Sequence, residues 1–592
     1  MLEVRLSRIQ YIKQRLGCSM VNITINGVSL SVPENSTILQ AAKSAGIEIP
    51  TLCFLKEYNE IGACRICLVE IKGYDRLAPA CNTTVEEGME INTRSARVIE
   101  ARRINLQLLM AQHDQNCLSC VRSENCKLQQ LCNDENITTQ PFKKDFEPFE
   151  WNTNWTLIRD ASKCVKCMRC VSICDQVQAN HAWTIKGTGK RTTVAPSFNT
   201  EGAPDMRCAL CGQCITHCPT GALTARDDCD KVFDAIADES KTVVVQIAPS
   251  VRTAWGSAFG LTPEESDIDL LAAALKQAGV DYVFSTDFSA DLTIMEEGSE
   301  FLELFTSGKT TEAPLFTSCC PGWVRYVNSH FPQTARHLST AKSPQQMLGA
   351  LIKSYFAEQQ GIDPETIYSV SIMPCVAKKS ECAREDFTDA CGDPDVDVVL
   401  TTREVDRFLK RKNIDVANLE PIELDRPMQD YTGAGTIFGA TGGVMEAALR
   451  SAYFLATKTN ADPDAFKEVR ATKETRVLPW REATFDIEDN TVRVAIASGL
   501  GNAEELVNAI EAGEVHYDFV EIMACPGGCV GGGGQPIVMD CEMAESREEV
   551  LRRLDSTCKL RRSHDNPDIT KIYENFLGTP LSHKAHDLLH TH

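Results

Sequence analysis

MACPGGCVGGGGQP, residues 523–536, places two cysteines in a loop built almost entirely of glycine, proline and small residues. Two further cysteine motifs precede it, TSCCPGW at 317–323 and MPCVAKK at 373–379. Each motif follows or borders an apolar, strand-like run. Glycine and proline in such loops let backbone amides approach a cluster sulfur and leave no bulk in the way. Four thiolates from three distant loops suffice for one iron–sulfur cubane, and the candidate ligands are Cys320, Cys375, Cys525 and Cys529.

The chain around these motifs alternates between strand-like and helical patterns from about residue 240. Four apolar runs are typical of strands buried on both faces of a sheet: KTVVVQIAPS, YSVSIMPC, VDVVLTT and TVRVAIASG. Strands that alternate with helices predict α/β layers. SGLGNAEEL at 498–506 follows a strand but lacks the full GxGxxG set, so NAD binding is not expected there.

Length and composition bound the class of protein. A chain of 592 residues predicts several domains, and a net charge of −22 argues against a nucleic-acid partner. Its 27 cysteines lie in a large chain without a secretory segment, which favours metal over disulfides. No run is apolar enough to span a membrane, and a cytoplasmic location is expected. Residues 1–20 are basic and are interpreted as an N-terminal extension; a presequence for a hydrogenosome or similar organelle is the alternative.

The first cysteine group follows a hairpin-and-helix pattern. Residues 21–32 alternate around Asn26-Gly27, which predicts a β-hairpin, and Ser36 is the expected N-cap of a helix that runs to Ala45. This lead-in suits a β-grasp ferredoxin. The ligand candidates for a [2Fe–2S] cluster are Cys53, Cys64, Cys67 and Cys81. Their spacing departs from that of plant ferredoxins, and zinc is the alternative metal.

The second group mixes one histidine with cysteines. Residues 97–112 predict an amphipathic helix that ends at an HxxxCxxCxxxxxC motif. The motif offers one nitrogen and three sulfurs for a [4Fe–4S] cluster: His113, Cys117, Cys120 and Cys126. Cys132 lies close by in the sequence, and on spacing alone it is an alternative ligand.

Two CxxCxxCxxxC runs come next and form a two-cluster ferredoxin signature, in which the fourth cysteine of each run ligates the other cluster. One expected ligand set is therefore Cys164, Cys167, Cys170 and Cys218. The other set is Cys174, Cys208, Cys211 and Cys214. The first run has Asp175 where proline is usual, and the long segment between the runs predicts an insertion.

The three loop motifs resemble the signature motifs of [FeFe]-hydrogenases, and the accessory segments recur in the same order in the large monomeric members. The resemblance implies that Cys320, Cys375, Cys525 and Cys529 hold a cubane. Cys529 would also bridge to a diiron subsite with CO, cyanide and a bridging dithiolate, completing an H-cluster. The resemblance further implies one [2Fe–2S] cluster and three accessory [4Fe–4S] clusters. The substrates would be hydrogen and protons, and dedicated maturation enzymes would assemble the diiron subsite.

The resemblance also predicts an α+β multidomain fold. It comprises an extension at 1–20, a β-grasp [2Fe–2S] ferredoxin-like domain at 21–99, a His/Cys [4Fe–4S] segment at 100–139, a two-[4Fe–4S] ferredoxin-like domain at 155–230, and a large two-lobed α/β catalytic domain at 240–592. The C-terminal SHKAHDLLHTH would wrap the catalytic domain rather than bind a separate metal. The leftover cysteines are expected to be free buried thiols: Cys18, Cys132, Cys229, Cys382, Cys391, Cys541 and Cys558.

Residues around the cluster match family positions as well. Lys378 and Ser250 match donors to cyanide, Gln345 matches a neighbour of CO, and the matching wall residues are Met373, Met523 and Phe438. For the methionines and the phenylalanine, ordinary core packing is the alternative. Proton delivery to a buried pocket requires a chain of hydroxyl and titratable groups. The family relay maps here to Cys319, Glu297, Ser339 and Glu300, in that order.

The electron partner stays open between a ferredoxin and the partner subunits of an NAD(P)-reducing or electron-bifurcating complex. A non-catalytic iron–sulfur assembly scaffold is the remote alternative. The intact TSCCPGW motif, with Cys319, argues against it.

Overall fold

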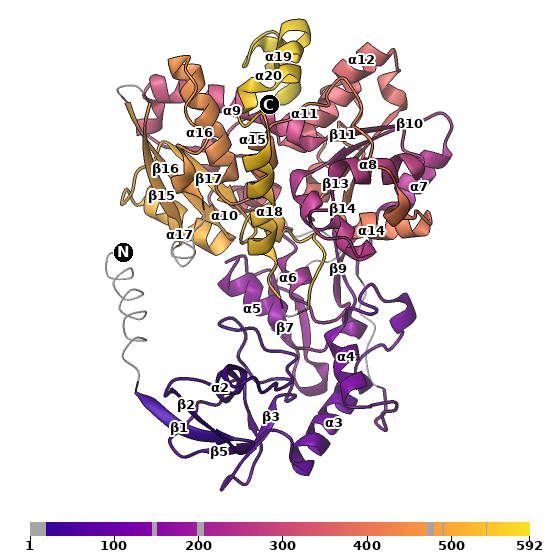
Figure 1. Ribbon diagram of the computed structural model, residues 1–592, viewed down its shortest axis with the longest axis vertical. Helices are drawn as coiled ribbons and strands as arrows, with labels where there is room; N and C mark the ends of the chain where they lie inside the picture. Colours follow the sequence, from indigo (N-terminus) through magenta and orange to yellow (C-terminus); the bar gives the residue numbers. More distant parts are fainter. Residues whose placement is uncertain are drawn as a thin grey trace.

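A computed structural model of the protein describes residues 19–144, 151–197, 207–470, 479–487, 490–539 and 541–591. The predicted extension lies outside these residues, apart from its last two, and so does Cys18. Figure 1 shows the N-terminal modules below a larger domain that contains the second half of the chain. The molecule is a mixed α/β multidomain protein. No helix in the described ranges is both long and apolar enough to cross a membrane.

The first module is a five-stranded sheet, ordered β2-β1-β5-β3-β4. The predicted hairpin is confirmed, because β1 (Met20–Ile25) pairs antiparallel with β2 (Val28–Pro33) around left-handed Asn26 and Gly27. The remaining strands are β3 (Leu68–Ile71), β4 (Ala78–Pro79) and β5 (Glu90–Asn92), of which β5 runs parallel to β1.

Helix α2 (Ile38–Ser44) follows the hairpin, and here the expected N-cap is wrong by one residue. The cap is Thr37 rather than Ser36. Thr37 Oγ1 accepts from the Gln40 amide at 3.2 Å, and Gln40 Oε1 accepts from the Thr37 amide at 3.0 Å. This reciprocal capping box satisfies two backbone donors at once, which a cap at Ser36 would not.

Helix α3 (Ala96–Ala111) confirms the helix predicted at 97–112 but not its amphipathic character. Ile99, Ile104 and Leu108 are 41%, 39% and 46% exposed, so apolar residues lie on the solvent side as well. The buried side carries Arg102, whose guanidinium donates to the carbonyls of Ile66, Leu68 and Thr93. These bonds hold α3 against the first module, and α4 (Lys127–Asp134) packs beside it.

The third module is built from two similar halves. Helices α5 (Arg169–Gln176) and α6 (Gln213–Thr216) each begin one residue before the third cysteine of a CxxCxxC run, and two short strand pairs belong to the same module. The pairs are β6 (Leu157–Arg159) with β9 (Leu223–Ala225), and β7 (Trp183–Lys186) with β8 (Thr193–Pro196). Equivalent residues of the two runs are left-handed: Lys166 and Leu210 have φ of 54° and 53°, and Met168 and Gly212 have φ of 65° and 73°. The backbone therefore repeats the same turn around each run.

Two four-stranded sheets form the rest of the molecule. The first is all parallel, ordered β11-β10-β13-β14: β11 (Tyr282–Ser285), β10 (Thr242–Ile247), β13 (Ile367–Met373) and β14 (Val398–Thr401). The second is ordered β12-β17-β16-β15: β12 (Leu315–Phe316), β17 (Phe519–Met523), β16 (Asn490–Ser498) and β15 (Arg481–Ile487), and only β15 is antiparallel. The four apolar runs predicted as strands are β10, β13, β14 and β16, so that prediction is confirmed.

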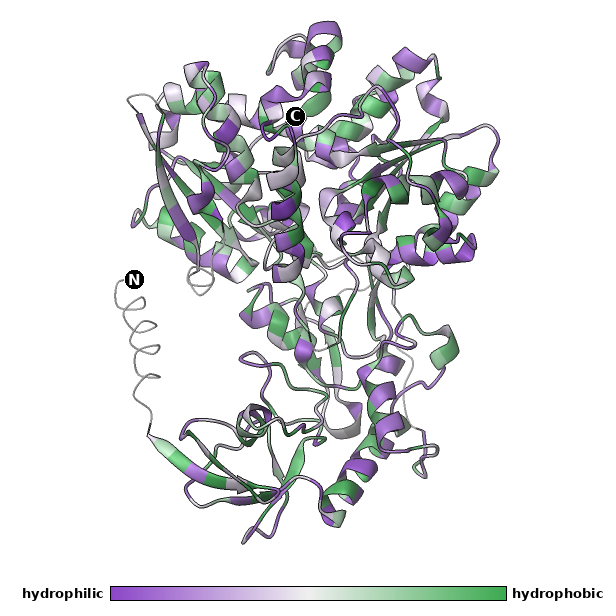
Figure 2. Cartoon of the chain, viewed as in Figure 1, coloured by the Kyte–Doolittle hydropathy of each residue, from purple (hydrophilic) through white to green (hydrophobic). Residues whose placement is uncertain are grey.

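Helices pack on the two sheets and on one another. They are α7 (Cys229–Ala237), α8 (Ile268–Gln277), α9 (Thr286–Thr306), α10 (Pro321–His330), α11 (Pro344–Leu351), α12 (Ala357–Gln360), α13 (Lys378–Glu381), α14 (Thr402–Arg411), α15 (Gly433–Thr436), α16 (Gly443–Thr457), α17 (Leu500–Glu511), α18 (Ala544–Thr557), α19 (Pro567–Ile572) and α20 (His583–Leu589). Most of them carry both hydrophobic and hydrophilic residues (Figure 2).

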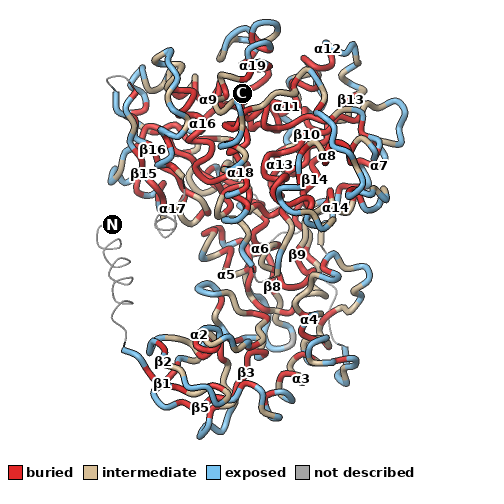
Figure 3. Tube along the Cα trace, in the orientation of Figure 1, coloured by how far each residue is buried: buried red, intermediate tan, exposed pale blue. Residues whose placement is uncertain are grey.

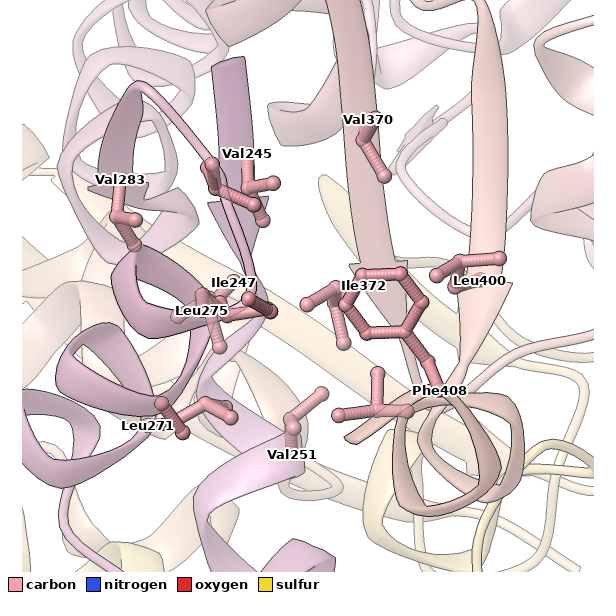
Figure 4. Close-up of a cluster of buried hydrophobic side chains, with 14 of the residues drawn as sticks. Val245, Ile247, Val251, Leu271, Leu275, Val283, Val370, Ile372, Leu400 and Phe408 are labelled. Atoms are coloured by element: carbon pink, nitrogen blue, oxygen red, sulfur yellow. The ribbon is translucent and has the colours of Figure 1, made fainter. Parts of the chain in front are cut away.

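The main core lies between the parallel sheet and its helices. Val245 and Ile247 of β10 stand beside Ile372 of β13, and Leu271 and Phe408 reach them from α8 and α14 (Figure 4). These side chains are almost completely inaccessible to solvent. Figure 3 shows buried residues concentrated in this upper domain, whereas much of the N-terminal module is exposed. The three cysteine loops therefore extend from a well-packed domain.

Candidate metal centre

The three cysteine loops leave their sheets at the carboxyl ends of parallel strands. Cys375 lies two residues beyond β13, Cys525 lies two residues beyond β17, and Cys320 is the N-cap of α10, which follows β12. Ligand sites in open α/β sheets gather at this edge because loops from different strands meet there.

The four thiols lie near one another. Burial raises the pKa of the Cys529 thiol well above its usual value, and the neighbouring thiolates Cys320, Cys375 and Cys525 raise it further. Such mutual repulsion is relieved when a metal cluster takes up the charges. The Ala524 amide donates to Cys320 Sγ at 3.4 Å, which is the kind of backbone contact a cluster thiolate receives. The donor set therefore fits an iron–sulfur cubane.

Glycines let the third loop close over the site. A Cβ on Gly532 would lie 2.3 Å from the Pro374 carbonyl oxygen, and a Cβ on Gly528 would lie 2.8 Å from the Thr441 amide nitrogen. Gly528 also has a φ of +87°, which disfavours other residues. Gly532 and Gly534 are thus required by close backbone approach to Pro374, which precedes Cys375.

Polar side chains predicted around the centre are buried there. Lys378 Nζ bonds the Cys319 carbonyl at 3.2 Å and Glu381 Oε2 at 2.9 Å. Burial lowers the pKa of Lys378, but the Glu381 carboxylate outweighs that effect and leaves it above its usual value. Glu381 also accepts from Gln345 Nε2 at 2.6 Å. Glu381 was not predicted from the sequence, although its i,i+3 spacing from Lys378 is a usable signal.

Two buried polar atoms near the predicted centre have no hydrogen-bond partner among the described residues. Ser250 Oγ and Gln345 Oε1 are buried and make no hydrogen bond in the described structure. Buried polar atoms are normally satisfied, so such orphans indicate a bound group that supplies the missing partner. The Ser250 hydroxyl therefore fits an acceptor of the implied diiron subsite, such as cyanide, whereas the Gln345 amide oxygen can only accept and needs a donor.

The predicted apolar wall residues divide between two clusters. Phe438 and Met523 pack in one buried apolar cluster with Cys319, and Cys320 and Cys529 contact that cluster. Met373, in contrast, packs with the core of the parallel sheet. The structure therefore brings two of the three predicted wall residues together with the cysteines in this cluster.

The four predicted relay residues are neighbours in space. Glu297 is fully buried on α9, and burial raises its pKa to about 8, with repulsion from Glu300 adding to the rise. The Glu297 carboxylate in turn raises the pKa of Cys319 beyond the effect of burial. Ser339 Oγ donates to Glu300 Oε2 at 2.6 Å, and Glu300 is half-buried. The groups thus run from the metal centre toward the surface.

The ferredoxin cysteines associate across the two runs. A single cavity is lined by the first three cysteines of one run and the last of the other: Cys164, Cys167, Cys170 and Cys218. Burial raises the pKa of Cys174 to about 12, and its largest thiolate neighbour is Cys208. Each fourth cysteine therefore lies with the opposite run.

The N-terminal cysteines form two contacting pairs. The Cys53 thiol lowers the pKa of Cys64 to about 6, and the Cys81 thiol lowers the pKa of Cys67. The Cys64 thiolate also raises the pKa of Cys67 by charge repulsion, so the two pairs lie close enough to form one site. All four side chains are available to a single small cluster.

His113 has one ring nitrogen free. Burial lowers its pKa, the ring bonds the Lys163 carbonyl, and Nδ1 has no partner within the described residues. A metal-bound imidazole has this arrangement, with one nitrogen on the metal and the other bonded to an acceptor. Cys132 lies near the same thiols, because Cys126 and Cys117 add to burial in raising its pKa to about 11. Proximity alone leaves both residues as candidates.

Contacts between the modules were not predictable from motifs. Asn59 is fully buried and donates to the carbonyls of Cys53 at 2.6 Å and Cys167 at 2.9 Å. A Cβ on Gly221 would lie 2.7 Å from Cys120 Sγ. Cys525 Sγ lies 3.8 Å from the Cys211 carbonyl oxygen. The cysteine sites therefore adjoin one another from the N-terminal module to the metal centre.

The remaining cysteines and the histidine tail need one correction. Cys541 is exposed, so the expectation that all leftover cysteines are buried is wrong for it. Cys229 is buried, whereas Cys382, Cys391 and Cys558 are half-buried. In the tail, His590 is fully buried and bonds side chains rather than other histidines.

Five family models match the chain in succession. They are a 2Fe-2S iron-sulfur cluster binding domain at 19–96, the NADH-ubiquinone oxidoreductase-G iron-sulfur binding region at 102–141, a 4Fe-4S dicluster domain at 163–222, the C-terminal domain of the iron only hydrogenase large subunit at 241–533, and the iron hydrogenase small subunit at 541–592.

Individual relatives match over most of their length. The NADP-reducing hydrogenase subunit HndD of Solidesulfovibrio fructosivorans is 46% identical over 97% of this chain and 99% of its own. Iron hydrogenase 1 of Clostridium pasteurianum is 38% identical over 96% and 99%. The solved structure of a single-residue variant of [FeFe]-hydrogenase HydA1 from Chlamydomonas reinhardtii is 43% identical with a TM-score of 0.54, over 61% of this chain and 98% of that one.

The fold, the cysteine sites and these matches define an iron–sulfur oxidoreductase with ferredoxin-like accessory domains and a hydrogenase catalytic domain. The chain belongs to the iron-only, or [FeFe]-, hydrogenase family, whose members act on hydrogen.

Proposed function

We propose that this chain catalyses reversible oxidation of hydrogen at an H-cluster held by Cys320, Cys375, Cys525 and Cys529. The observation that carries the proposal is the convergence of these four buried thiols, with Cys319 and Lys378 on one side and the Cys211 loop on the other. When bound, the diiron subsite supplies an open metal position for the hydride and a base for the proton. The residues of the chain hold the cluster, exclude water and move protons and electrons.

The proposed cofactor inventory is one [2Fe–2S] cluster, three accessory [4Fe–4S] clusters and the H-cluster. The corresponding domains are a β-grasp domain at 21–99, the His/Cys segment at 100–139, the two-cluster domain at 155–230 and a two-lobed catalytic domain at 240–592. The mixed sheet in which β5 runs parallel to β1 supports the β-grasp assignment. The two separate four-stranded sheets support two lobes.

The proposed electron path follows the contacts between cysteine sites. Asn59 joins the first site to the ferredoxin module through the Cys53 and Cys167 carbonyls. The last transfer would pass from the set containing Cys211 to the cubane at Cys525, whose sulfur lies 3.8 Å from the Cys211 carbonyl. Direct contact of this kind keeps the tunnelling distance short.

The proposed proton path runs from Cys319 through Glu297 and Ser339 to Glu300. Glu297 has a pKa near 8, so it holds a proton at neutral pH and can both give and take one. Ser339 donates to Glu300, which stands partly in solvent. Lys378 and Ser250 would donate to the cyanide ligands.

Infrared spectroscopy of protein matured with the dedicated enzymes tests the proposal. Bound CO and cyanide should give stretching bands, and the protein should reduce a redox dye with hydrogen. Cys320→Ser should lose both signals, whereas Cys541→Ser, at an exposed cysteine outside every site, should keep them. Matured protein with neither signal would refute the proposal.

A specific observation favours a second, more particular function: hydrogenase subunit of an NAD(P)-reducing assembly. The relative named as an NADP-reducing hydrogenase subunit is 46% identical over 97% of this chain. The partner would then be a protein that carries the nucleotide site, rather than a free ferredoxin. Purification from the native source tests this, because partner chains should co-elute and hydrogen should reduce NAD(P) only in their presence. The cytoplasmic location stays a prediction.

A further inference from the structure

The C-terminal tail inserts one buried histidine beside the proton relay. His590 is fully buried at the end of α20, and its neighbours pair with the segment that follows Ser339. The Lys342 amide donates to the Leu589 carbonyl at 2.8 Å, and the Thr591 amide donates to the Thr340 carbonyl at 2.8 Å. The tail thus adds a short strand pairing to the relay segment and fixes the imidazole in place.

The imidazole bonds on both sides. Its Nε2 lies 3.1 Å from Glu296 Oε2, and its Nδ1 lies 2.8 Å from Thr340 Oγ1. Other titratable groups that face it are Tyr573, which bonds Glu296, and His586, whose ring stacks on His590 at 4.8 Å. His590 is therefore surrounded by partners rather than by solvent.

The direction of these bonds follows from what each partner can accept. Glu296 accepts from the Tyr573 hydroxyl through Oε1 and from the Leu581 amide at 2.9 Å through Oε2. The glutamate oxygens thus serve as acceptors, and His590 Nε2 is placed to donate to Oε2. Glu296 is itself fixed by Tyr573 and Leu581, and it anchors the imidazole through Nε2.

Thr340 has one hydroxyl proton, and the relay residue Glu300 is placed to accept it. Both the amide and Oγ1 of Thr340 lie 3.1 Å from Glu300 Oε1, while Ser339 Oγ donates to Oε2. For Thr340 to donate to Glu300, it must accept from His590 Nδ1. In that arrangement the bonds run in one direction, from His590 through Thr340 to Glu300.

We propose that His590 is a positioning residue for the proton relay: it orients the Thr340 hydroxyl toward Glu300 and thereby holds the outer carboxylate in line with Ser339. The inference rests on the proposed relay function of Glu300. It assigns to the C-terminal tail a part in proton transfer, in addition to its packing against the catalytic domain.

Two substitutions at Thr340 separate hydroxyl orientation from packing. In matured holoenzyme, Thr340→Val keeps the branched shape and removes the hydroxyl, and hydrogen evolution should fall about tenfold. Thr340→Ser keeps the hydroxyl and should stay within about twofold of wild type. The solvent deuterium isotope effect should rise in Thr340→Val alone, while the infrared bands and the KM for the electron donor stay unchanged. Equal rates for the two variants would overturn the proposal.

His590→Gln should reproduce the loss, since glutamine cannot donate on both sides. Combined with Thr340→Val, it should cause no further loss, because both changes break one chain of bonds. His583→Gln is the matched control, since His583 begins the same helix with a side chain that is 94% exposed. Fully additive losses in the double variant would point to separate structural damage and overturn the proposal.

Glu300→Gln tests the underlying relay separately. If Glu300→Gln slows turnover but His590→Gln and Thr340→Val do not, the positioning role fails and the relay stands. If Glu300→Gln evolves hydrogen at the wild-type rate, the relay itself fails, and the positioning role fails with it.

Discussion

Gly212 and Gly533 touch through their backbones. A Cβ added to Gly533 would lie 2.6 Å from the Gly212 Cα atom and 2.5 Å from the Cys211 carbonyl oxygen. Gly212 belongs to the ferredoxin module, and Gly533 belongs to the loop that carries Cys525 and Cys529. The glycine run thus does two things: it closes the metal loop, and it lets the neighbouring cluster site approach the catalytic one.

We therefore expect Gly533→Ala to disturb the junction between the two sites. Backbone atoms cannot move aside as a flexible side chain would, so the substitution should destabilise the fold by about 1–3 kcal/mol. Electron transfer into the catalytic cluster should slow as the sites separate, which rapid-mixing spectroscopy would measure. Gly298→Ala is the control for stability, since a Cβ there meets nothing within 4 Å and its φ is ordinary. Unchanged stability and rate in Gly533→Ala would contradict this account.

Cys319→Ala should separate cluster assembly from turnover. Cys319 lies beside Glu297 and next to Cys320, but its thiol is not one of the four proposed ligands. Removal of its sulfur should leave iron content and infrared bands intact and lower hydrogen evolution by at least about a hundredfold. Cys558→Ala, at a half-buried cysteine outside the site, should keep the wild-type rate. A Cys319→Ala enzyme that evolves hydrogen normally would remove this residue from the relay.

Cysteine spacing predicted the order of the modules and the groups of cysteines that meet, because CxxC runs and loop motifs are local features. The hairpin at Asn26-Gly27 and the strand β10 were also predictable, since turn chemistry and apolar runs act locally. The contacts of Asn59 and His590 were not predictable, because each side chain bonds a residue more than a hundred positions away in the sequence. Nothing in the flanking sequence marks a buried asparagine or a tail histidine for such a partner.

Helix α3 illustrates a second limit. Its apolar residues suggested one buried stripe, yet the buried face includes Arg102, which satisfies three carbonyls of the first module. Ile104 and Leu108 are left exposed. A pattern of residue types cannot reveal that a charged side chain is the better partner for unsatisfied backbone acceptors.

The raised pKa of Glu297 predicts a pH-dependent stability. The unfolded carboxyl titrates near 4.5, whereas the folded one titrates near 8. Between these values the unfolded state loses its proton while the folded state keeps it, so rising pH favours unfolding. The contribution of Glu297 is therefore fully present below pH 4.5 and is lost as pH rises through about 8.

Glu297→Gln tests this sign, because glutamine is neutral at every pH. The apparent thermal midpoint of the variant, relative to wild type, should rise between pH 5 and pH 8. Glu303→Gln, an exposed residue on the same helix, should show no such trend. A difference that stays constant across this range would mean that Glu297 is not buried as a neutral acid.

Substitution at the second accessory site should decide between His113 and Cys132. His113 presents an unpartnered Nδ1 and bonds the Lys163 carbonyl, which is the arrangement of a metal-bound imidazole. His113→Ala should therefore lower iron content by the equivalent of one [4Fe–4S] cluster, whereas Cys132→Ala should keep all of it. His113→Cys should restore the iron and lower the reduction potential of that cluster, because a thiolate adds negative charge where a neutral imidazole stood. Iron counting with redox-monitored paramagnetic resonance measures both effects, and loss of the cluster in Cys132→Ala alone would assign the fourth ligand to the cysteine.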